Sequence, residues 1–314
     1  MGIGTGAGPG RSVGGWRNMS TEALEEQYSP SRWSPRMGSD AVIQAHLAAT
    51  AAGTQRARAG TETSLHIPYG GGEGEKLDIY LPRDTSGTFP LLVYIHGGYW
   101  QCLSKEESGF AAPPLVSQGV MVAAVGYDTA PKGRCCSAEA LAAGAGPAPT
   151  RLCPLSSQAT WTSWCCRCGA ASPSWWSTTV GSGAVLVSGV YDLEPILHTY
   201  VNDALKMSRE VAQRNSPMLC VTPPAPMAAA CEVLVAVAQH DSPEFRRQSQ
   251  EYGQAGWRSG SILPAPHSPQ ALRTAGWSVS LMDLAGVDHF DIIEKLSEES
   301  YVLTQVILNM ISRA

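Results

Sequence analysis

The chain has 314 residues, of which 44% are hydrophobic and 16% charged, and its formal net charge is −5. This length suits one large α/β domain or two small ones, and the acidic balance gives no basic footprint for nucleic acid or an anionic membrane, so the expected partners are small molecules. No apolar run approaches the roughly 18 residues of a membrane span, and the glycine-rich start lacks a signal-peptide core, which predicts a cytoplasmic protein whose cysteines are thiols.

The predicted strands are apolar, β-favouring runs bounded by glycine or polar turns. In chain order they cover residues 65–69, 76–81, 91–95, 119–125, 184–187, 231–237 and 278–281. The first two flank a glycine-rich turn and predict an opening β-hairpin. The next two, with a helix-capable segment between them, predict a right-handed βαβ unit. We therefore expect an α/β fold with a mostly parallel sheet flanked by helices.

The predicted helices rest on helical spacing of apolar residues, on helix-favouring composition and on capping residues. In chain order they cover residues 22–27, 40–54, 104–110, 204–213, 246–252 and a closing helix that starts at Ser297. In the closing helix, Leu303, Ile307 and Met310 recur at helical spacing, so this face should pack on the sheet. Residues 1–18 are glycine-rich and predict a disordered tail, which leaves 19–314 as a single domain.

Two stretches have an abnormal composition. From Gly133 to Val180 there is no Ile, Phe, Tyr, Met, Lys, His, Asp or Asn, and no periodicity can be traced. We expect a disrupted or irregular segment over 134–182, and our hypothesis is translation in a wrong reading frame or across a wrong splice junction. Residues 254–278 carry a Pro/Ser-rich insert without acidic residues, which suggests a retained intron or a tolerated surface insertion. Sequencing of the transcript tests both interpretations.

The strand over 91–95 runs directly into the turn that holds the expected oxyanion-binding residues. These residues are His96, Gly97, Gly98, Tyr99 and Trp100. Glycine has no Cβ atom, so the backbone can take a positive φ and point N–H groups into a cleft. An H-G-G turn after an early strand is the oxyanion-hole half of an α/β-hydrolase site. Tyr99 and Trp100 could also line an aryl pocket, although a tryptophan after a turn is more often a packing residue.

Two candidate catalytic residues follow predicted strands in the second half of the chain. Asp241 lies in a turn after 231–237, and His289 lies in a turn after the last strand. An acid followed by a histidine, with the nucleophile upstream of both, is the chain order of α/β-hydrolase triads. The structural alternatives are a helix N-cap for Asp241 and an ordinary surface histidine for His289. Their combination with the H-G-G turn favours the catalytic interpretation.

The nucleophile of such a triad is missing from the sequence. No G-x-S-x-G occurs in the chain, and its expected place falls within the abnormal stretch. Ser182 precedes a strand, whereas a nucleophile must follow one. Ser188 follows a strand, but Leu186 occupies the position two residues earlier where the elbow needs glycine. We therefore expect neither serine to be the nucleophile. The cysteines of this region lack paired CxxC spacing, so no metal site is predicted. These cysteines are Cys165, Cys166 and Cys168.

These motifs together make the chain similar to the kynurenine formamidase, or arylformamidase, family of α/β-hydrolases. The segments that carry the resemblance are Glu25–Trp33, Pro68–Gly70, Gly72–Lys76, HGGYWQ at 96–101, Ala130–Gly133, Leu186–Ile196, Gln213–Pro217, Asp241–Phe245 and Val287–Phe290. The similarity covers roughly residues 19–133, 183–252 and 279–312. It breaks over 134–182, where family members carry a helix, a strand and a G-H-S-A-G-like elbow.

The resemblance implies hydrolysis of N-formyl-L-kynurenine to L-kynurenine and formate in tryptophan breakdown, with no metal or organic cofactor. In that reaction a serine attacks the formyl carbon, His289 takes its proton and returns it to the arylamine, and Asp241 orients the imidazole. Backbone N–H groups around Gly98 and Tyr99 hold the oxyanion. The resemblance also allows a homodimer and adds the nucleus as a second compartment.

Because no serine is found, we expect the family assignment to hold and the chain as written to be inactive. Loss of the nucleophile costs about 10⁶-fold in one well-studied serine hydrolase, or roughly 8 kcal/mol of transition-state stabilisation. Two alternatives stay open. One is a carboxylesterase-like hydrolase, which also uses an H-G-G turn. The other is a non-catalytic α/β-hydrolase scaffold that binds a ligand or a partner.

Overall fold

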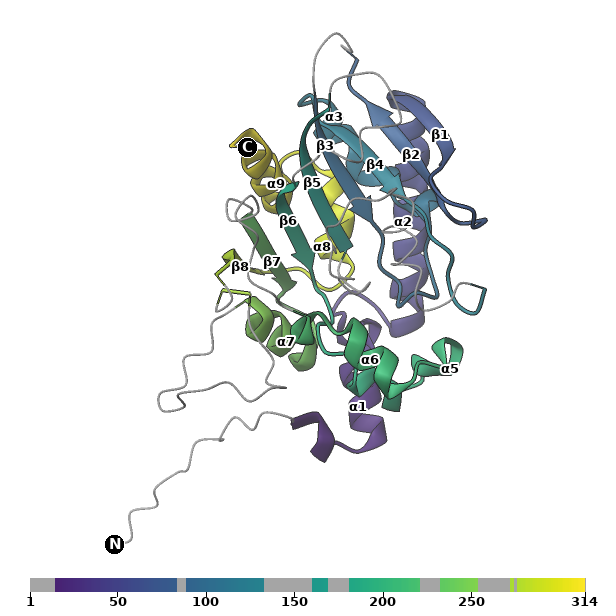
Figure 1. Ribbon diagram of the computed structural model, residues 1–314, viewed down its shortest axis with the longest axis vertical. Coiled ribbons are helices and arrows are strands. Elements are labelled where there is room, and N and C mark those ends of the chain that lie inside the picture. Colours follow the sequence, from purple (N-terminus) through teal and green to yellow (C-terminus); the bar gives the residue numbers. More distant parts are fainter. Residues whose placement is uncertain are drawn as a thin grey trace, which may run out of the picture.

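The computed structural model describes residues 15–83, 89–132, 160–168, 181–220, 232–253, 272–273 and 276–313, with only the backbone described for 160–168 and for 181 and 182. These residues form an eight-stranded sheet flanked by helices (Figure 1). The strands are β1 (Glu62–Pro68), β2 (Lys76–Leu81), β3 (Phe89–Ile95), β4 (Met121–Val125), β5 (Thr160–Cys168), β6 (Gly181–Val187), β7 (Glu232–Ala238) and β8 (Ser278–Leu284). Their order across the sheet is β1-β2-β4-β3-β5-β6-β7-β8.

The sheet contains two groups of parallel strands, and β2 pairs antiparallel with both β1 and β4. The pair β3 and β4 runs in parallel, as does the group β6, β7 and β8. Between them lies β5, which is antiparallel to both β3 and β6. The mostly parallel sheet is confirmed, as are the opening hairpin of β1 and β2 and the parallel pairing of β3 with β4.

A regular strand, β5, lies within the segment 134–182 that was expected to be irregular. The remainder of that segment up to residue 180 lies outside the described residues, as does most of 254–278. Residues 160–168 form a strand at the centre of the sheet, and β6 already begins at Gly181. The sequence of β5 is rich in threonine and tryptophan, which favour strands, but it has no clear alternation to reveal one. Pairing partners on both sides supply what the local pattern lacks.

The helices connect the strands and cover the sheet (Figure 1). They are α1 (Thr21–Gln27), α2 (Ser39–Gly60), α3 (Ala112–Val116), α5 (Asn202–Leu205), α6 (Arg209–Asn215), α7 (Pro243–Gly253), α8 (Asp291–Glu294) and α9 (Val302–Ser312). Shorter 3₁₀ turns are η1 (Gly15–Asn18), η2 (Pro30–Trp33), η3 (Lys105–Glu107), η4 (Gly109–Ala111), η6 (Pro195–His198), η7 (Pro217–Leu219) and η9 (Lys295–Ser297).

Two predicted helices are divided in the structure. The helix expected over 204–213 is split into α5 and α6 because Lys206 takes a left-handed φ of 48°. Ser208 then caps α6 by accepting a hydrogen bond from the N–H of Val211. Residues 104–110 form the tight turns η3 and η4, and α3 begins only at Ala112. The split between α5 and α6 is decided by the backbone conformation of Lys206. The spacing of hydrophobic residues carries no information about that conformation.

The two ends of the domain also differ in their bounds from the expectation. Residues 15–18, which we assigned to the disordered tail, form η1 with Trp16 buried, while residues 1–14 lie outside the described residues. The closing helix is divided into η9 and α9, which begins at Val302. The face with Leu303, Ile307 and Met310 is buried, as its spacing predicted.

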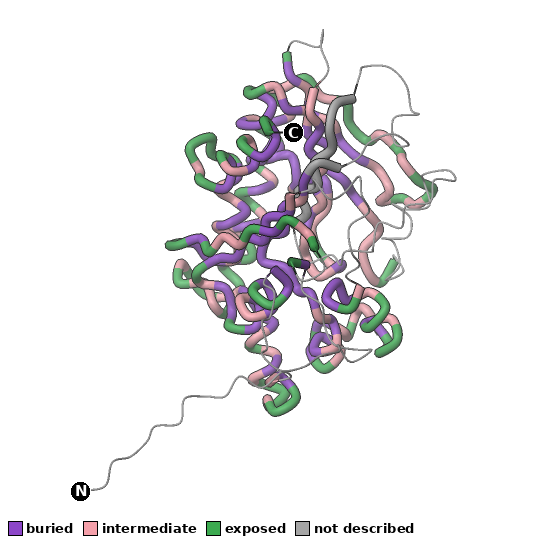
Figure 2. The backbone as a smooth tube through the Cα atoms, turned by 60° about the vertical axis from the view of Figure 1, so that its left-hand side comes forward, coloured by how far each residue is buried: buried purple, intermediate pink, exposed green. Residues whose placement is uncertain are grey.

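The core lies on both faces of the sheet, as the purple tube segments show (Figure 2). Neighbouring residues of β6 alternate between the two faces. Val185 and Val187 pack in one cluster with side chains of α2, α3 and α9, whereas Leu186 packs with Tyr252 of α7 in another. A strand that is buried on both faces reads as a continuous apolar run, which is why β6 and β7 were recognised from sequence.

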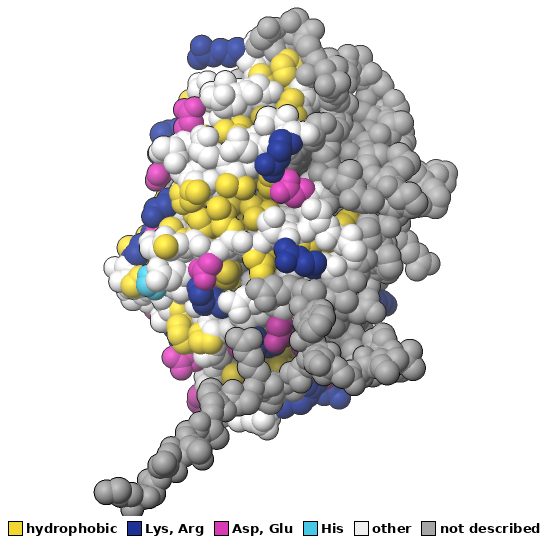
Figure 3. Space-filling model, turned by 90° about the vertical axis from the view of Figure 1, so that its left-hand side faces the viewer, with side chains coloured by type: hydrophobic (Ala, Val, Ile, Leu, Met, Phe, Trp, Pro, Cys, Tyr) yellow, Lys and Arg dark blue, Asp and Glu magenta, His cyan; other side chains and the backbone are white. Residues whose placement is uncertain are grey.

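One of the two edge strands of the sheet is β8, and the other is β1. Leu281 and Met282 of this strand are only half-buried, as is Trp277 beside it, and hydrophobic side chains gather on this side of the molecule among charged ones (Figure 3). No helix in the described part of the chain is long and apolar enough to cross a membrane.

Candidate active site

The candidate acid and base lie together at the carboxyl end of the sheet. Asp241 follows β7, His289 follows β8, and the Nδ1 atom of His289 lies 2.6 Å from Oδ1 of Asp241. The imidazole packs edge-on against Phe245 and Phe290, with ring centroids 5.1 and 5.5 Å away. Its Nε2 has no hydrogen-bond partner among the described residues. This arrangement orients the ring and leaves Nε2 free to take a proton.

Asp241 is buried and uses both carboxylate oxygens. While Oδ1 faces His289, Oδ2 accepts hydrogen bonds from the Ser188 hydroxyl at 2.5 Å and from the N–H of Ala238 at 3.0 Å. The alternative role of Asp241 as a helix N-cap does not occur. Ser242 caps α7 instead, because its hydroxyl accepts from the N–H of Phe245.

Ser188 stands at the end of β6 and has one feature of a nucleophile elbow. Its φ of 47° lies in the left-handed region, which non-glycine residues adopt only with strain. Its hydroxyl, however, is buried and donates to Asp241 rather than to His289. Ser182 lies at the amino-terminal end of β6, whereas the acid–base pair lies at the carboxyl ends of the parallel strands. That neither serine is the nucleophile stays a prediction.

The direction of β5 bears on the missing nucleophile. A nucleophile elbow follows a strand whose carboxyl end lies at the same end of the sheet as the acid and the base. In the structure Thr160, the first residue of β5, pairs with Val187 at the carboxyl end of β6. The carboxyl end of β5 therefore lies beside the amino-terminal end of β6, away from Asp241 and His289.

The H-G-G turn has the backbone that an oxyanion hole needs. Gly98 has a φ of 102°, and a Cβ atom there would lie 2.2 Å from the carbonyl oxygen of Cys102. The chain then folds back, as the N–H groups of Gln101 and Cys102 both donate to the carbonyl oxygen of Gly98. Within the described residues, the N–H groups of Gly98 and Tyr99 have no acceptor. They are the donors expected to hold an oxyanion.

His96 supports the turn and carries no charge at neutral pH. Its ring stacks on Tyr127 with centroids 4.1 Å apart, and its Nδ1 lies 2.8 Å from the carbonyl oxygen of Gly97. Burial lowers the pKa of His96 to about 4, an effect that the bond to Gly97 only partly offsets. The Tyr127 hydroxyl also donates to the carbonyl oxygen of His96 at 2.9 Å. His96 therefore shapes the turn.

The two aromatic residues of the turn are packed against the N-terminal helix region. The Tyr99 hydroxyl donates to the carbonyl oxygen of Tyr28 at 2.7 Å, and burial raises the pKa of Tyr99 so that it stays a donor. Trp100 is 9% exposed and belongs to a hydrophobic cluster with Tyr28, Leu193 and Phe245. Of the two interpretations of Trp100, packing fits these contacts better than an open aryl pocket.

Comparison with known proteins shows the family of the chain. No family model matches it. A kynurenine formamidase of Danio rerio is 46% identical over 309 residues, which span 95% of this chain and 99% of that protein. A kynurenine formamidase of Salmo salar is 45% identical over the same shares. The chain belongs to the kynurenine formamidase family. The resemblance drawn from the HGGYW turn, Asp241 and His289 is thus confirmed at the level of the family.

Solved structures show the α/β-hydrolase fold. A protein of Silicibacter sp. TM1040, solved as a candidate thioesterase, aligns with a TM-score of 0.61 at 21% identity and covers 91% of this chain and 98% of its own. An esterase of Pyrobaculum calidifontis aligns with a TM-score of 0.53 at 15% identity, over 87% of this chain and 93% of its own. The fold expectation is confirmed.

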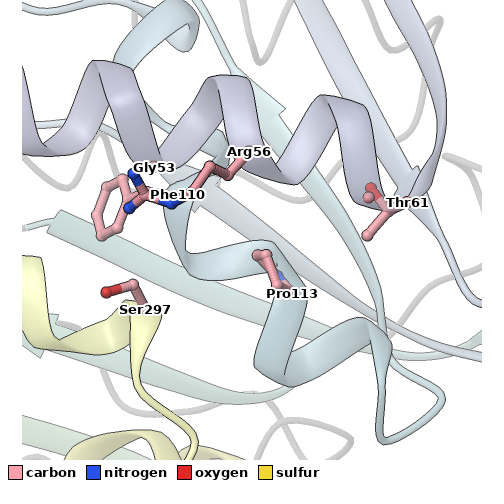
Figure 4. A pocket seen from close by; sticks show the side chains of 7 residues that line it. Gly53, Arg56, Thr61, Phe110, Pro113 and Ser297 are labelled. Carbon is pink, nitrogen blue, oxygen red and sulfur yellow. The ribbon is translucent and has the colours of Figure 1, made fainter.

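A groove elsewhere on this kynurenine formamidase homologue is separate from the acid–base pair. It lies between α2 and the turns η4 and η9, has a volume of about 290 Å³, and is lined by residues that include Arg56 and Phe110 (Figure 4). None of the expected site residues lines it. The groove therefore plays no part in the candidate active site.

Sequence reasoning missed the residues that support the site in this family member. Ser188 was weighed only as a nucleophile, yet it holds the acid. Asp288 was quoted only as part of a motif, yet it is buried and anchors the loop of His289. The signal in the sequence was the position of Asp288 directly before His289, because a charged residue that is buried beside a site must be paired or hydrogen-bonded. The side chains of Cys165, Cys166 and Cys168 lie outside the described residues.

Proposed function

We propose that this chain retains the substrate-binding and acid–base half of a kynurenine formamidase and that, as written, it does not turn over N-formyl-L-kynurenine. The relatives named kynurenine formamidase support the substrate class. The observation that supports the loss of turnover is the position of Ser188, which is the serine at the acid–base pair in the described residues and donates its hydroxyl to Asp241. His289 is left without a hydroxyl to activate there.

The proposed roles follow from the geometry. Asp241 fixes the imidazole through Nδ1 and stabilises its protonated form, while Nε2 of His289 faces the reacting group. The N–H groups of Gly98 and Tyr99 supply the donors for the tetrahedral oxygen. In an active relative, a serine would attack the formyl carbon, the counterpart of His289 would pass the proton to the leaving arylamine, and water would then release formate. Among the residues that the structure describes, no serine is placed to take this first step.

The test combines turnover, labelling and binding. The recombinant chain should release no kynurenine from N-formyl-L-kynurenine above the level of its His289→Ala variant. A fluorophosphonate, which reacts with activated serines, should not label it. Calorimetry with L-kynurenine should still detect binding. Formamidase activity that His289→Ala abolishes would overturn the proposal, and so would stoichiometric serine labelling.

A carboxylesterase-like activity is the second outcome that the same assay resolves. Turnover of p-nitrophenyl acetate in preference to N-formyl-L-kynurenine, lost in His289→Ala, would favour an esterase. The likeness to solved esterases concerns the fold only, so it gives no support to this activity.

A further inference from the structure

The segment Ser20–Arg36, which comprises α1 and η2 and which we call the N-terminal strap, contacts the three separate loops that build the candidate site. We propose that this strap positions the acid–base pair and that Arg36 is the positioning residue through which it sets the orientation of His289. The inference rests on the acid–base pair of the proposed function, but it does not require turnover.

The strap first holds the oxyanion turn and the helix that follows the acid. Its Tyr28 accepts the hydrogen bond from Tyr99 through the carbonyl oxygen and, through its own hydroxyl, donates to Glu244 of α7 at 3.1 Å. One residue earlier, Gln27 accepts the Ser242 hydroxyl at 2.5 Å with its carbonyl oxygen. Ser242 follows Asp241 directly, so the strap reaches the residue next to the acid.

These contacts are buried and specific. Glu244 is 4% exposed and is also held by Arg247, with 2.8 Å between Nη2 and Oε2. Gln248 donates to the Tyr28 hydroxyl at 2.8 Å and accepts the N–H of Tyr191 at 2.7 Å. A polar network of this kind is rigid when each member is satisfied. It connects the strap to α7 and to the loop after β6 as one unit.

The strap then holds the loop of the base. Arg36 donates through Nε to Oδ2 of Asp288 at 2.8 Å and through Nη2 to Oδ1 at 3.2 Å, which is a bidentate pair. Ser34 adds a hydrogen bond to Oδ2 at 2.6 Å. Asp288 also accepts the N–H groups of Phe290 and Asp291, at 2.9 and 2.7 Å, and thereby starts α8.

His289 lies between two residues that this carboxylate fixes. Asp288 precedes it and Phe290 follows it, so the backbone on both sides of the imidazole is tied to one buried group. Arg36 additionally reaches Glu294 at the end of α8 at 2.9 Å. A guanidinium that bridges the loop and the helix restricts rotation of the loop. The hydrogen bond between Nδ1 of His289 and Asp241 depends on that restriction.

The experiment reads His289 directly by proton NMR. The hydrogen-bonded Nδ1–H of His289 should give a resonance far downfield, assigned by its absence in His289→Ala. In Arg36→Met this proton should exchange with water at least about tenfold faster, equivalent to about 1.4 kcal/mol of lost protection. Arg36→Lys keeps the charge but not the bidentate geometry, so it should recover thermal stability more fully than it recovers the resonance.

The matched control is Arg32→Met. Arg32 lies in the same strap, is exposed, and has no side-chain partner among the described residues, so its variant should keep the wild-type resonance. A folded Arg36→Met protein with wild-type exchange would overturn the proposal and leave Arg36 a merely structural role. If Arg36→Met does not fold, Ser34→Ala decides, since it removes one donor to Asp288. Wild-type exchange in Ser34→Ala and Arg36→Lys together would also overturn the proposal.

Neither result depends on the proposed function. Turnover of N-formyl-L-kynurenine would contradict the loss of activity while leaving the NMR comparison intact. Unchanged exchange in the Arg36 and Ser34 variants would contradict the strap's role whether or not the chain is active.

Discussion

The two regions of the sheet beside β6 differ in what they bring to the site. On one side β7 and β8 run parallel to β6, and the residues after them meet within hydrogen-bond distance at Asp241 and His289. On the other side β5 is antiparallel to β6, so its carboxyl end points away from that edge. Both regions complete the same sheet, but the acid and the base follow strands of the parallel region.

This difference shows that a strand can meet the pairing requirement of the sheet without having the direction that a catalytic site requires. Backbone hydrogen bonds fill a gap in a sheet with either strand direction. A catalytic site at the carboxyl ends of strands needs a particular direction, because only then do consecutive turns converge. A chain can therefore keep the fold of its family without keeping the strand direction that a catalytic site needs.

The largest effect should come from exchanging the β5 region. Replacement of residues 134–182 by the corresponding segment of the Danio rerio relative should restore a parallel strand with a nucleophile elbow. Formamidase activity should rise by up to about 10⁶-fold over the present chain, measured as kynurenine release. The same chimera with His289→Ala should lose the gain. A chimera that folds but stays inactive would show that the parallel region is not functional.

The parallel region should be sensitive to loss of its acid. Asp241→Ala removes the acceptor of three buried or half-buried donors, namely His289, Ser188 and the N–H of Ala238. We expect the free energy of unfolding to fall by about 4 kcal/mol, measured by urea denaturation. Asp283→Ala is the control, because its ion pair with Arg246 is exposed and is worth about 1 kcal/mol or less. Equal losses in both would contradict this account of Asp241.

The H-G-G turn should make the free energy of unfolding depend on pH through His96. The pKa of His96 falls from 6.5 to about 4 in the folded chain because burial disfavours its charge. The folded state then binds fewer protons than the unfolded state, so stability is full above about pH 6.5 and is lost as pH falls towards 4, by on the order of 3 kcal/mol. His96→Asn should lack this part of the slope in urea denaturation between pH 7 and 4. An unchanged slope would contradict a buried, neutral His96.

The smallest effect distinguishes strain from contact in the same turn. Gly98→Ala combines a φ of 102° with a Cβ atom 2.2 Å from the Cys102 carbonyl oxygen, so we expect a loss of about 2–3 kcal/mol in the free energy of unfolding. Gly119 has a φ of 78° but nothing within 4 Å of an added Cβ, so Gly119→Ala should lose about 1 kcal/mol. Thermal denaturation compares the two, and equal losses would show that the close approach to Cys102 is unimportant.

Most of the fold could be predicted because the strands that form it are buried on both faces. The apolar runs that became β3, β4, β6 and β7 stand out without any knowledge of their neighbours. The split at Lys206 and the strand at 160–168 could not be predicted, since one depends on a single backbone angle and the other on pairing partners far away in the chain.

The sequence by itself determined the family, because HGGYW, Asp241 and His289 occur in an order that few other folds require. It also exposed the absence of a nucleophile motif, since such a motif is local. Only the tertiary structure decided that Asp241 serves His289 and Ser188 together, that Ser242 rather than Asp241 caps α7, and that β5 runs against its neighbours. These features join segments that are distant along the chain, and local propensity carries no information about such pairings.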